Sequence, residues 1–139
     1  MKYWDSPAQA ITAFLKLMEK IEQDEKLLTG IKKINQLIWY DYTQNGEECS
    51  FWSDCRNNQF SYGPGRPGDK PNLTLILSAD QGHLSWANKI NAAMAITRGR
   101  IKIKGSAMGL LRLAPKSRKV AKLYESALTE LGFQDKLEI

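Results

Sequence analysis

The sequence has no long apolar run. A helix needs about eighteen consecutive apolar residues to cross a bilayer, and no such stretch occurs. The first residues, Met-Lys-Tyr-Trp-Asp-Ser-Pro, lead directly into an amphipathic pattern without the apolar block of a signal peptide. We therefore expect a soluble, cytoplasmic protein. With 139 residues, 42% of them hydrophobic, the chain is long enough for a single domain over residues 1–139 with its own core.

Residues that bind metals or perform covalent catalysis are scarce. His83 is the one histidine, and the two cysteines, Cys49 and Cys55, do not form a C-x-x-C motif. A zinc site needs more ligands of these kinds, and a hydrolytic triad needs a histidine beside a nucleophile. We expect reduced thiols, no metal, no cofactor and no enzymatic activity. His83 is expected to be a surface or capping residue early in a helix.

Acidic residues are absent from one long stretch. Between Gln81 and Tyr124 there is no Asp or Glu, whereas ten of the twenty Lys and Arg residues lie there. This asymmetry predicts that an anionic partner approaches the C-terminal half, although a solvated cationic face would give the same pattern. No aromatic residue occurs from Arg98 to Lys122, so nucleic-acid bases would have nothing to stack on. Nucleic acid is therefore not the expected partner.

The first eighty residues predict a helix followed by meandering strands. Ser6 has the form of an N-terminal cap, and apolar residues behind it repeat every three or four positions up to Ile21. The polar stretch 22–25 can interrupt this helix before a C-terminal cap at Gly30. Asn45-Gly46 is typical of a hairpin turn. The ranges predicted as strands are 34–42, 48–54, 59–63 and 72–78.

The second half predicts helices around one basic strand. Asp80 is expected to cap a helix reaching Ile90, and Ser117 to cap the last helix, which Gly132 ends. Residues 100–104 alternate basic residues with isoleucine, so the isoleucines should face the helices and the cations should face water. The predicted fold is α+β, an antiparallel sheet with helices packed on one face. Small and methionine side chains near these helices can leave an adaptable cavity, although the same composition fits a filled core.

Three strings of residues resemble the sterol carrier protein type-two family. They are Leu-Thr-Leu-Ile-Leu-Ser at 73–78, Ile-Asn-Ala-Ala-Met-Ala-Ile at 90–96 and Gly-Arg-Ile-Lys-Ile-Lys-Gly at 99–105. Their order is similar to the family's strand, helix, apolar segment and basic strand between two glycines. The resemblance is best from residue 73 to residue 131. It implies a roughly five-stranded, mostly antiparallel sheet whose helices enclose a hydrophobic tunnel for sterols, fatty acids, acyl-CoAs or phospholipids.

From the residues and this resemblance we expect a non-enzymatic protein that binds or transfers lipids. The alternative is an accessory module that binds a partner protein or presents a lipid intermediate to a partner enzyme. The residues expected to line the tunnel are Leu84, Ile90, Met94, Ile103, Met108, Leu111, Leu123 and Tyr124. The residues expected at its rim, facing an anionic headgroup or an anionic membrane surface, are Arg100, Arg112, Lys116 and Lys119.

Overall fold

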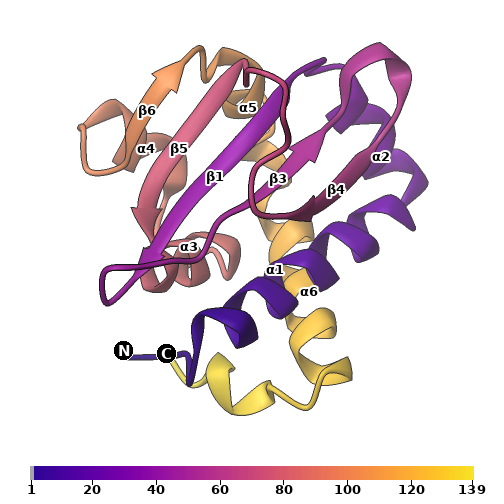
Figure 1. Ribbon diagram of the computed structural model, residues 1–139. Coiled ribbons are helices and arrows are strands. Elements are labelled where there is room, and N and C mark those ends of the chain that lie inside the picture. The colour runs from indigo at the N-terminus through magenta and orange to yellow at the C-terminus, as the bar shows by residue number, and fades with distance from the viewer. Residues whose placement is uncertain (1) are drawn as a thin grey trace.

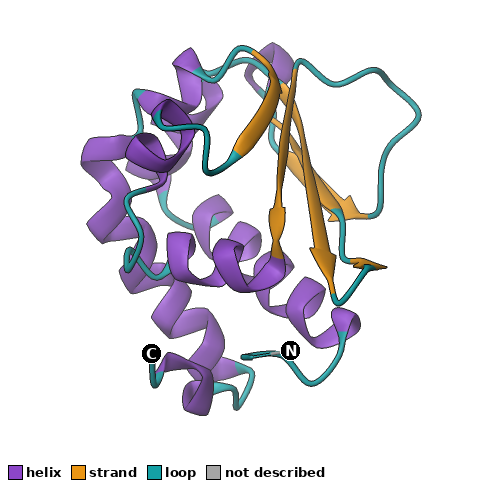
Figure 2. Ribbon diagram, turned by 90° about the vertical axis from the view of Figure 1, so that its left-hand side faces the viewer, coloured by secondary structure: helices purple, strands orange, loops and turns teal. Residues whose placement is uncertain are grey.

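The computed structural model describes residues 2–139, which form one mixed sheet with helices on one of its faces (Figure 1). The helices gather on one side of the strands when the molecule is viewed along the sheet (Figure 2). In chain order the elements are α1 (Pro7–Glu22), α2 (Glu25–Lys32), β1 (Leu37–Gln44), β2 (Glu47–Glu48), β3 (Phe51–Asp54), η1 (Arg56–Asn58), β4 (Ser61–Pro64), β5 (Leu73–Ser78), α3 (Ala79–Trp86), α4 (Ala92–Thr97), β6 (Lys102–Gly105), α5 (Met108–Leu111), η2 (Ala114–Lys116), α6 (Ser117–Glu130) and η3 (Gln134–Leu137).

Among residues 2–139 the sheet has six strands, five of them in the order β4-β3-β1-β5-β6, with β2 paired to β1. Every pairing is antiparallel except that of β1 with β5, which is parallel and sets Tyr40 opposite Leu75. The α+β class and the mostly antiparallel sheet are thus confirmed. The strands do not simply meander, because the chain leaves edge strand β4 and returns beside β1 through the loop 65–72.

That loop crosses the sheet face that carries no helices (Figures 1 and 2). Arg66 holds it there: its Nε donates to Asp41 Oδ1 at 2.7 Å and its Nη1 to Glu48 Oε1 at 2.9 Å. The same guanidinium lies over the Trp39 ring, 5.9 Å from its centroid. Since this face is covered by a pinned loop, the helical face is the one that receives the main core.

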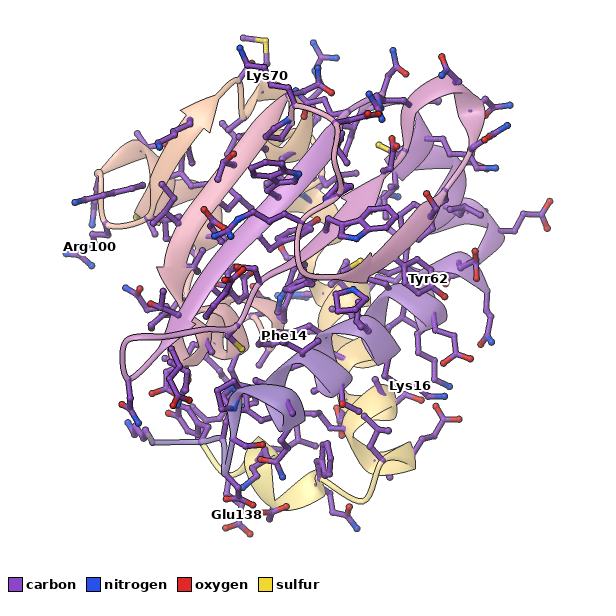
Figure 3. The ribbon with its side chains drawn as sticks, in the orientation of Figure 1. Phe14, Lys16, Tyr62, Lys70, Arg100 and Glu138 are labelled. Atoms are coloured by element: carbon purple, nitrogen blue, oxygen red, sulfur yellow. The ribbon has the colours of Figure 1, made fainter. Side chains whose placement is uncertain are left out.

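The core is centred on Phe14 of α1, which has no exposed surface. Its ring stacks on Phe51 of β3 at 5.4 Å and on Tyr124 of α6 at 6.4 Å, between ring centroids. Trp4 meets the same ring edge-on at 5.5 Å. Figure 3 shows Phe14 at the centre of the molecule, where α1 passes over the sheet. These contacts lock α1 and α6 together and leave the space beside them to shorter helices.

Several local predictions are confirmed. Ser6 caps α1 by accepting the Gln9 N–H at 3.1 Å, and Asn45 and Gly46 have the positive φ values of a hairpin turn. Gly132 has φ +77°, and the Phe133 N–H behind it donates to Leu128 O at 2.8 Å. This is the hydrogen bond of a Schellman motif.

Other local predictions are wrong. Gly30 lies inside α2 rather than at a C-terminal cap, because Asp24 caps a new helix by accepting the Leu27 N–H at 3.0 Å. Ser78, not Asp80, caps α3 through a capping box, and α3 ends at Trp86. Ile90 therefore lies outside that helix.

Two further residues differ from expectation. Ser117 begins α6 without capping it, since its hydroxyl donates to the Ala114 carbonyl. His83 is fully buried rather than at the surface. No helix among residues 2–139 combines the length and the apolar character that crossing a membrane requires.

Candidate functional site

An apolar cavity of about 160 Å³ lies between the helices and the sheet. Its floor is built by β1 and β5, whose side chains alternate between the two faces of the sheet. Ile38, Tyr40 and Tyr42 of β1 border the cavity, and the parallel register sets Leu75 opposite Tyr40 and Leu77 opposite Tyr42. The parallel pairing thus lays two buried rows of side chains next to each other under the helices.

The wall formed by α4 is made of small side chains. Asn91 caps this six-residue helix by accepting the Met94 N–H at 3.0 Å. Ala92, Ala93 and Ile96 border the cavity. Because two of these three side chains are single methyl groups, α4 closes the cavity without filling it.

A second wall is formed by the end of α2, by α5 and by the turn η2. Leu110, Leu111 and Leu113 border the cavity from α5 and the residues that follow it. A Cβ on Gly109 would come 2.9 Å from Ile34 Cγ2, so α5 packs directly against the segment that precedes β1. This close approach brings Ile34 into the lining and makes a continuous apolar wall.

Within the described part of the chain, the lining contains no Asp, Glu, Lys, Arg or His. Its polar groups are neutral: the Tyr40 hydroxyl shares a 3.0 Å hydrogen bond with Ser53 Oγ, and the Cys55 thiol donates to Gln36 O at 3.3 Å. Burial raises the pKa of Tyr40 to about 12 and also raises the pKa of the Cys55 thiol. The cavity is therefore an uncharged, largely hydrocarbon environment, suited to an apolar guest.

Of the eight residues predicted to line the tunnel, Leu111 borders this cavity. Met94 and Met108 point to solvent, with 46% and 64% of their surface exposed. Tyr124 is buried on α6, outside the lining. The remaining four are half-buried and lie outside the lining: Leu84, Ile90, Ile103 and Leu123.

The sequence reasoning missed the aromatic floor and the end of α3. Tyr40, Tyr42 and Trp86 border the cavity, yet none of them belongs to a helical apolar stripe. The signal that could have found them was the alternation Ile38-Tyr40-Tyr42 in a strand that was already predicted. Identifying it as a cavity floor required knowing that β5 pairs beside β1.

The predicted rim residues are all exposed. Arg112 and Lys116 flank the α5–η2 wall, and Arg100 projects from the β6 edge of the sheet (Figure 3). Lys119 differs from these three because its Nζ lies 3.2 Å from Asp24 Oδ2. The four predicted rim cations are thus exposed, and one of them, Lys119, is already paired with Asp24.

A second buried cluster lies away from the cavity lining. His83 Nδ1 is 2.6 Å from the Tyr124 hydroxyl, and Nε2 is 2.8 Å from Lys136 O. A carbonyl oxygen only accepts, so Nε2 carries the proton and Nδ1 accepts from Tyr124. Burial lowers the pKa of His83. The ring is thus held neutral and connects α3 to α6 and η3.

Comparison with known proteins gives one family and several relatives. The family model described as the SCP-2 sterol transfer family matches residues 14–116. A hydroxysteroid dehydrogenase-like protein 2 of Xenopus laevis is 32% identical over 72 residues. That match covers 51% of this chain and 17% of the frog protein, so the chain corresponds to a small part of that longer protein.

Two solved structures share the fold. The sterol carrier protein domain 2 of Helicoverpa armigera has a TM-score of 0.61 at 24% identity, covering 76% of this chain and 83% of that one. Sterol Carrier Protein-2 of Aedes aegypti, solved in complex with the C16 fatty acid palmitate, has a TM-score of 0.53 at 16% identity, covering 82% of this chain and 96% of that one.

Proposed function

Because the chain belongs to the SCP-2 sterol transfer family, we propose that it binds a long-chain lipid in the cavity between helices and sheet and carries it without altering it chemically. The observation that supports this most strongly is the lining, which is apolar and free of charged side chains among residues 2–139. The Aedes aegypti relative was solved with palmitate, which makes a C16 acyl chain the first ligand to test.

The energetics favour binding through the hydrocarbon chain. Each buried methylene is worth about 0.8 kcal/mol, so a roughly fourteen-carbon chain gains on the order of 10 kcal/mol before ordering costs are subtracted. An exposed ion pair at the rim adds about 0–1 kcal/mol. The lining should therefore determine affinity, and the rim should determine which end of the ligand stays outside.

A carrier rather than an enzyme fits the chemistry of the lining. Ser53 is engaged by Tyr40, and the raised pKa of Cys55 keeps this thiol protonated. No His or carboxylate borders the cavity within residues 2–139 to act as a base. A bound lipid would meet no activated nucleophile.

The α4–β6–α5 side is the surface that we propose meets an anionic headgroup or membrane. Its exposed methionines, Met94 and Met108, belong to helices that border the cavity. Arg100, Arg112 and Lys116 lie on the same segment of chain and are exposed. Cations near an anionic bilayer contribute about 1 kcal/mol each, which would hold this side of the cavity against the lipid source.

The test is a titration with a fluorescent C16 fatty acid, competed by unlabelled palmitate. Ala93→Phe places a ring in the α4 wall and should weaken binding at least about tenfold by filling the cavity. Ala8→Phe, at an exposed position of α1, is the matched control and should leave binding unchanged. Non-saturable binding, or equal binding by the Ala93→Phe variant, would refute the proposed function. Native mass spectrometry of the purified protein should also detect a co-purifying lipid.

A further inference from the structure

Two buried polar atoms beside the cavity have no hydrogen-bond partner within the described chain. They are Ser85 Oγ and Trp86 Nε1, from adjacent residues at the end of α3, and both residues border the cavity. Native proteins pair the large majority of such atoms, so two neighbouring exceptions require an explanation. Both residues border the cavity, although the two atoms themselves have almost no accessible surface, so a ligand atom becomes their partner only after a small rotation of each side chain.

Four other polar side chains of the lining are already satisfied. Tyr40 and Ser53 bond to each other at 3.0 Å, and Cys55 and Ser117 each donate to a main-chain carbonyl. Among the lining residues, unused hydrogen-bonding capacity is therefore concentrated at the α3 end. The other two unpaired buried atoms, Gln36 Oε1 and Trp39 Nε1, belong to residues outside the lining.

Tyr42 joins this group from the floor. A Cβ on Gly82 would lie only 2.3 Å from Tyr42 Cε2, so the Tyr42 ring packs against the backbone of α3. Trp86 stands beside the same floor, 6.0 Å from the Tyr40 ring centroid. Burial raises the pKa of the Tyr42 hydroxyl, and the nearby Trp86 indole N–H opposes part of this rise. The indole N–H and the Tyr42 oxygen nevertheless do not have the geometry of a hydrogen bond. Three side chains that can donate thus converge where α3 meets β1.

This group lies at the opposite end of the strand from α5. Gln36, just before β1, donates through Nε2 to Ser106 O at 3.1 Å beside α5, whereas Tyr42 meets α3. At about 3.3 Å per residue, Gln36 and Tyr42 are about 20 Å apart along the chain. Figure 1 shows α5 and α3 near the two ends of β1. A long lipid lying along β1 would therefore have one end near the cations that follow α5 and the other near α3.

Building on the proposed function, we propose that Ser85, Trp86 and Tyr42 recognise an uncharged hydrogen-bond acceptor on the inner end of the lipid, such as a ketone, ester or alcohol oxygen. A carboxylate or phosphate would be buried there without a cation, since none borders the cavity within residues 2–139. A plain hydrocarbon end would leave the donors unpaired. Small side-chain rotations would bring the Ser85 hydroxyl and the Trp86 indole N–H, both of them donors, to the cavity surface.

The same reasoning predicts the direction in which a lipid lies in the cavity. A lipid with a charged headgroup enters with its hydrocarbon end towards α3 and keeps the headgroup near Arg112 and Lys116. A neutral lipid with an oxygen at its leading end gains hydrogen bonds that the charged lipid cannot form there. The α3 end thus distinguishes lipids of equal chain length by the chemistry of their inner end.

The experiment compares dodecane, 2-dodecanone and dodecanoate, with dissociation constants measured for each. Ser85→Ala removes one donor with little change in shape. Trp86→Phe removes the indole N–H together with part of the ring, and the comparison with dodecane corrects for the lost apolar contact. Each should weaken 2-dodecanone about five- to tenfold relative to dodecane, the effect of one lost hydrogen bond. Trp52→Phe, on the opposite face of the sheet, is the control and should leave the ratio unchanged. Ser85→Ala carries the affinity test if the Trp86 variant fails to fold.

A second readout reports the contact directly. In ¹⁵N-labelled wild-type protein the Trp86 indole N–H signal, assigned through Trp86→Phe or by sequential assignment, should move downfield with 2-dodecanone and not with dodecane or dodecanoate. Two results together would overturn the proposal while leaving lipid binding intact. In both variants the affinity for 2-dodecanone relative to dodecane would stay within twofold of wild type, and the indole signal would not move. An equal shift with dodecanoate would overturn the requirement for an uncharged group. No binding of any of the three ligands would refute the proposed function itself.

Discussion

Two glycines inside helices should respond in opposite directions to the same substitution. In α3, a Cβ on Gly82 would lie 2.3 Å from Tyr42 Cε2 and 2.9 Å from Cζ. Ordinary contacts begin at 3.4 Å, so the ring or the helix must move by roughly 1 Å. Tyr42 cannot move freely because it meets Phe14 and Phe51 edge-on, with both ring centroids 5.3 Å away. The strain of Gly82→Ala therefore falls on the floor of the cavity.

The expected cost is that of an overpacked core, about 1–3 kcal/mol in the free energy of unfolding. Gly30→Ala is the matched control. Gly30 is also helical, and its nearest neighbour, Leu113 Cδ2, lies 4.0 Å from the added Cβ position. Without a collision, the higher helix propensity of alanine should stabilise the protein by about 0.5–1 kcal/mol.

Urea denaturation of both variants and of wild type measures these free energies directly. Fatty-acid titration of the Gly82→Ala variant at low temperature should also show weakened binding, because the displaced Tyr42 ring borders the cavity. A Gly82→Ala variant as stable as Gly30→Ala would refute the packing of α3 on Tyr42.

Two further predictions concern buried rings. His83 is neutral in the native state because burial lowers its pKa, whereas histidine in the unfolded chain takes up a proton near its ordinary pKa of about 6.5. The unfolded state then binds more protons, so stability should fall as pH drops from about 7.5 to 5.5, by at most about 1.4 kcal/mol per pH unit. His83→Gln should abolish this slope in denaturation curves, since the chain has no other histidine; a slope that persists would contradict the assignment. Phe14→Ala should cost about 3–5 kcal/mol in urea denaturation, because the ring is fully buried between sheet and α6; a loss below about 1 kcal/mol would show that α1 packs differently.

Features with a local physical cause could be predicted from the sequence. The Asn45-Gly46 turn follows from the positive φ that both residues tolerate, and the end of α6 follows from Gly132. The basic strand ending at Gly105 follows from alternation. Here a Cβ on Gly105 would lie 2.1 Å from Asn72 O, so the glycine also lets β6 approach β5 closely. The family resemblance rested on this strand and the segments before it.

The composition of the cavity depends on non-local pairing and could not be predicted in this way. Choosing flexible methionines as cavity residues selected Met94 and Met108, which are exposed on short helices. The floor instead comes from Tyr40 and Tyr42, whose position depends on β5 pairing beside β1 across a long loop. His83 was misplaced for the same reason, since its partners Tyr124 and Lys136 are distant in sequence.

The central claim is that a lipid chain occupies the space between β1, β5 and the helices. The most direct test is the set of intermolecular NOEs between ¹³C-labelled palmitate and the protein at saturation. We expect NOEs to Ile38 of β1, Leu75 of β5 and Leu111 of α5, all of which border the cavity. NOEs confined to Trp39 and Trp52 on the loop-covered face, or none at saturating palmitate, would contradict the account.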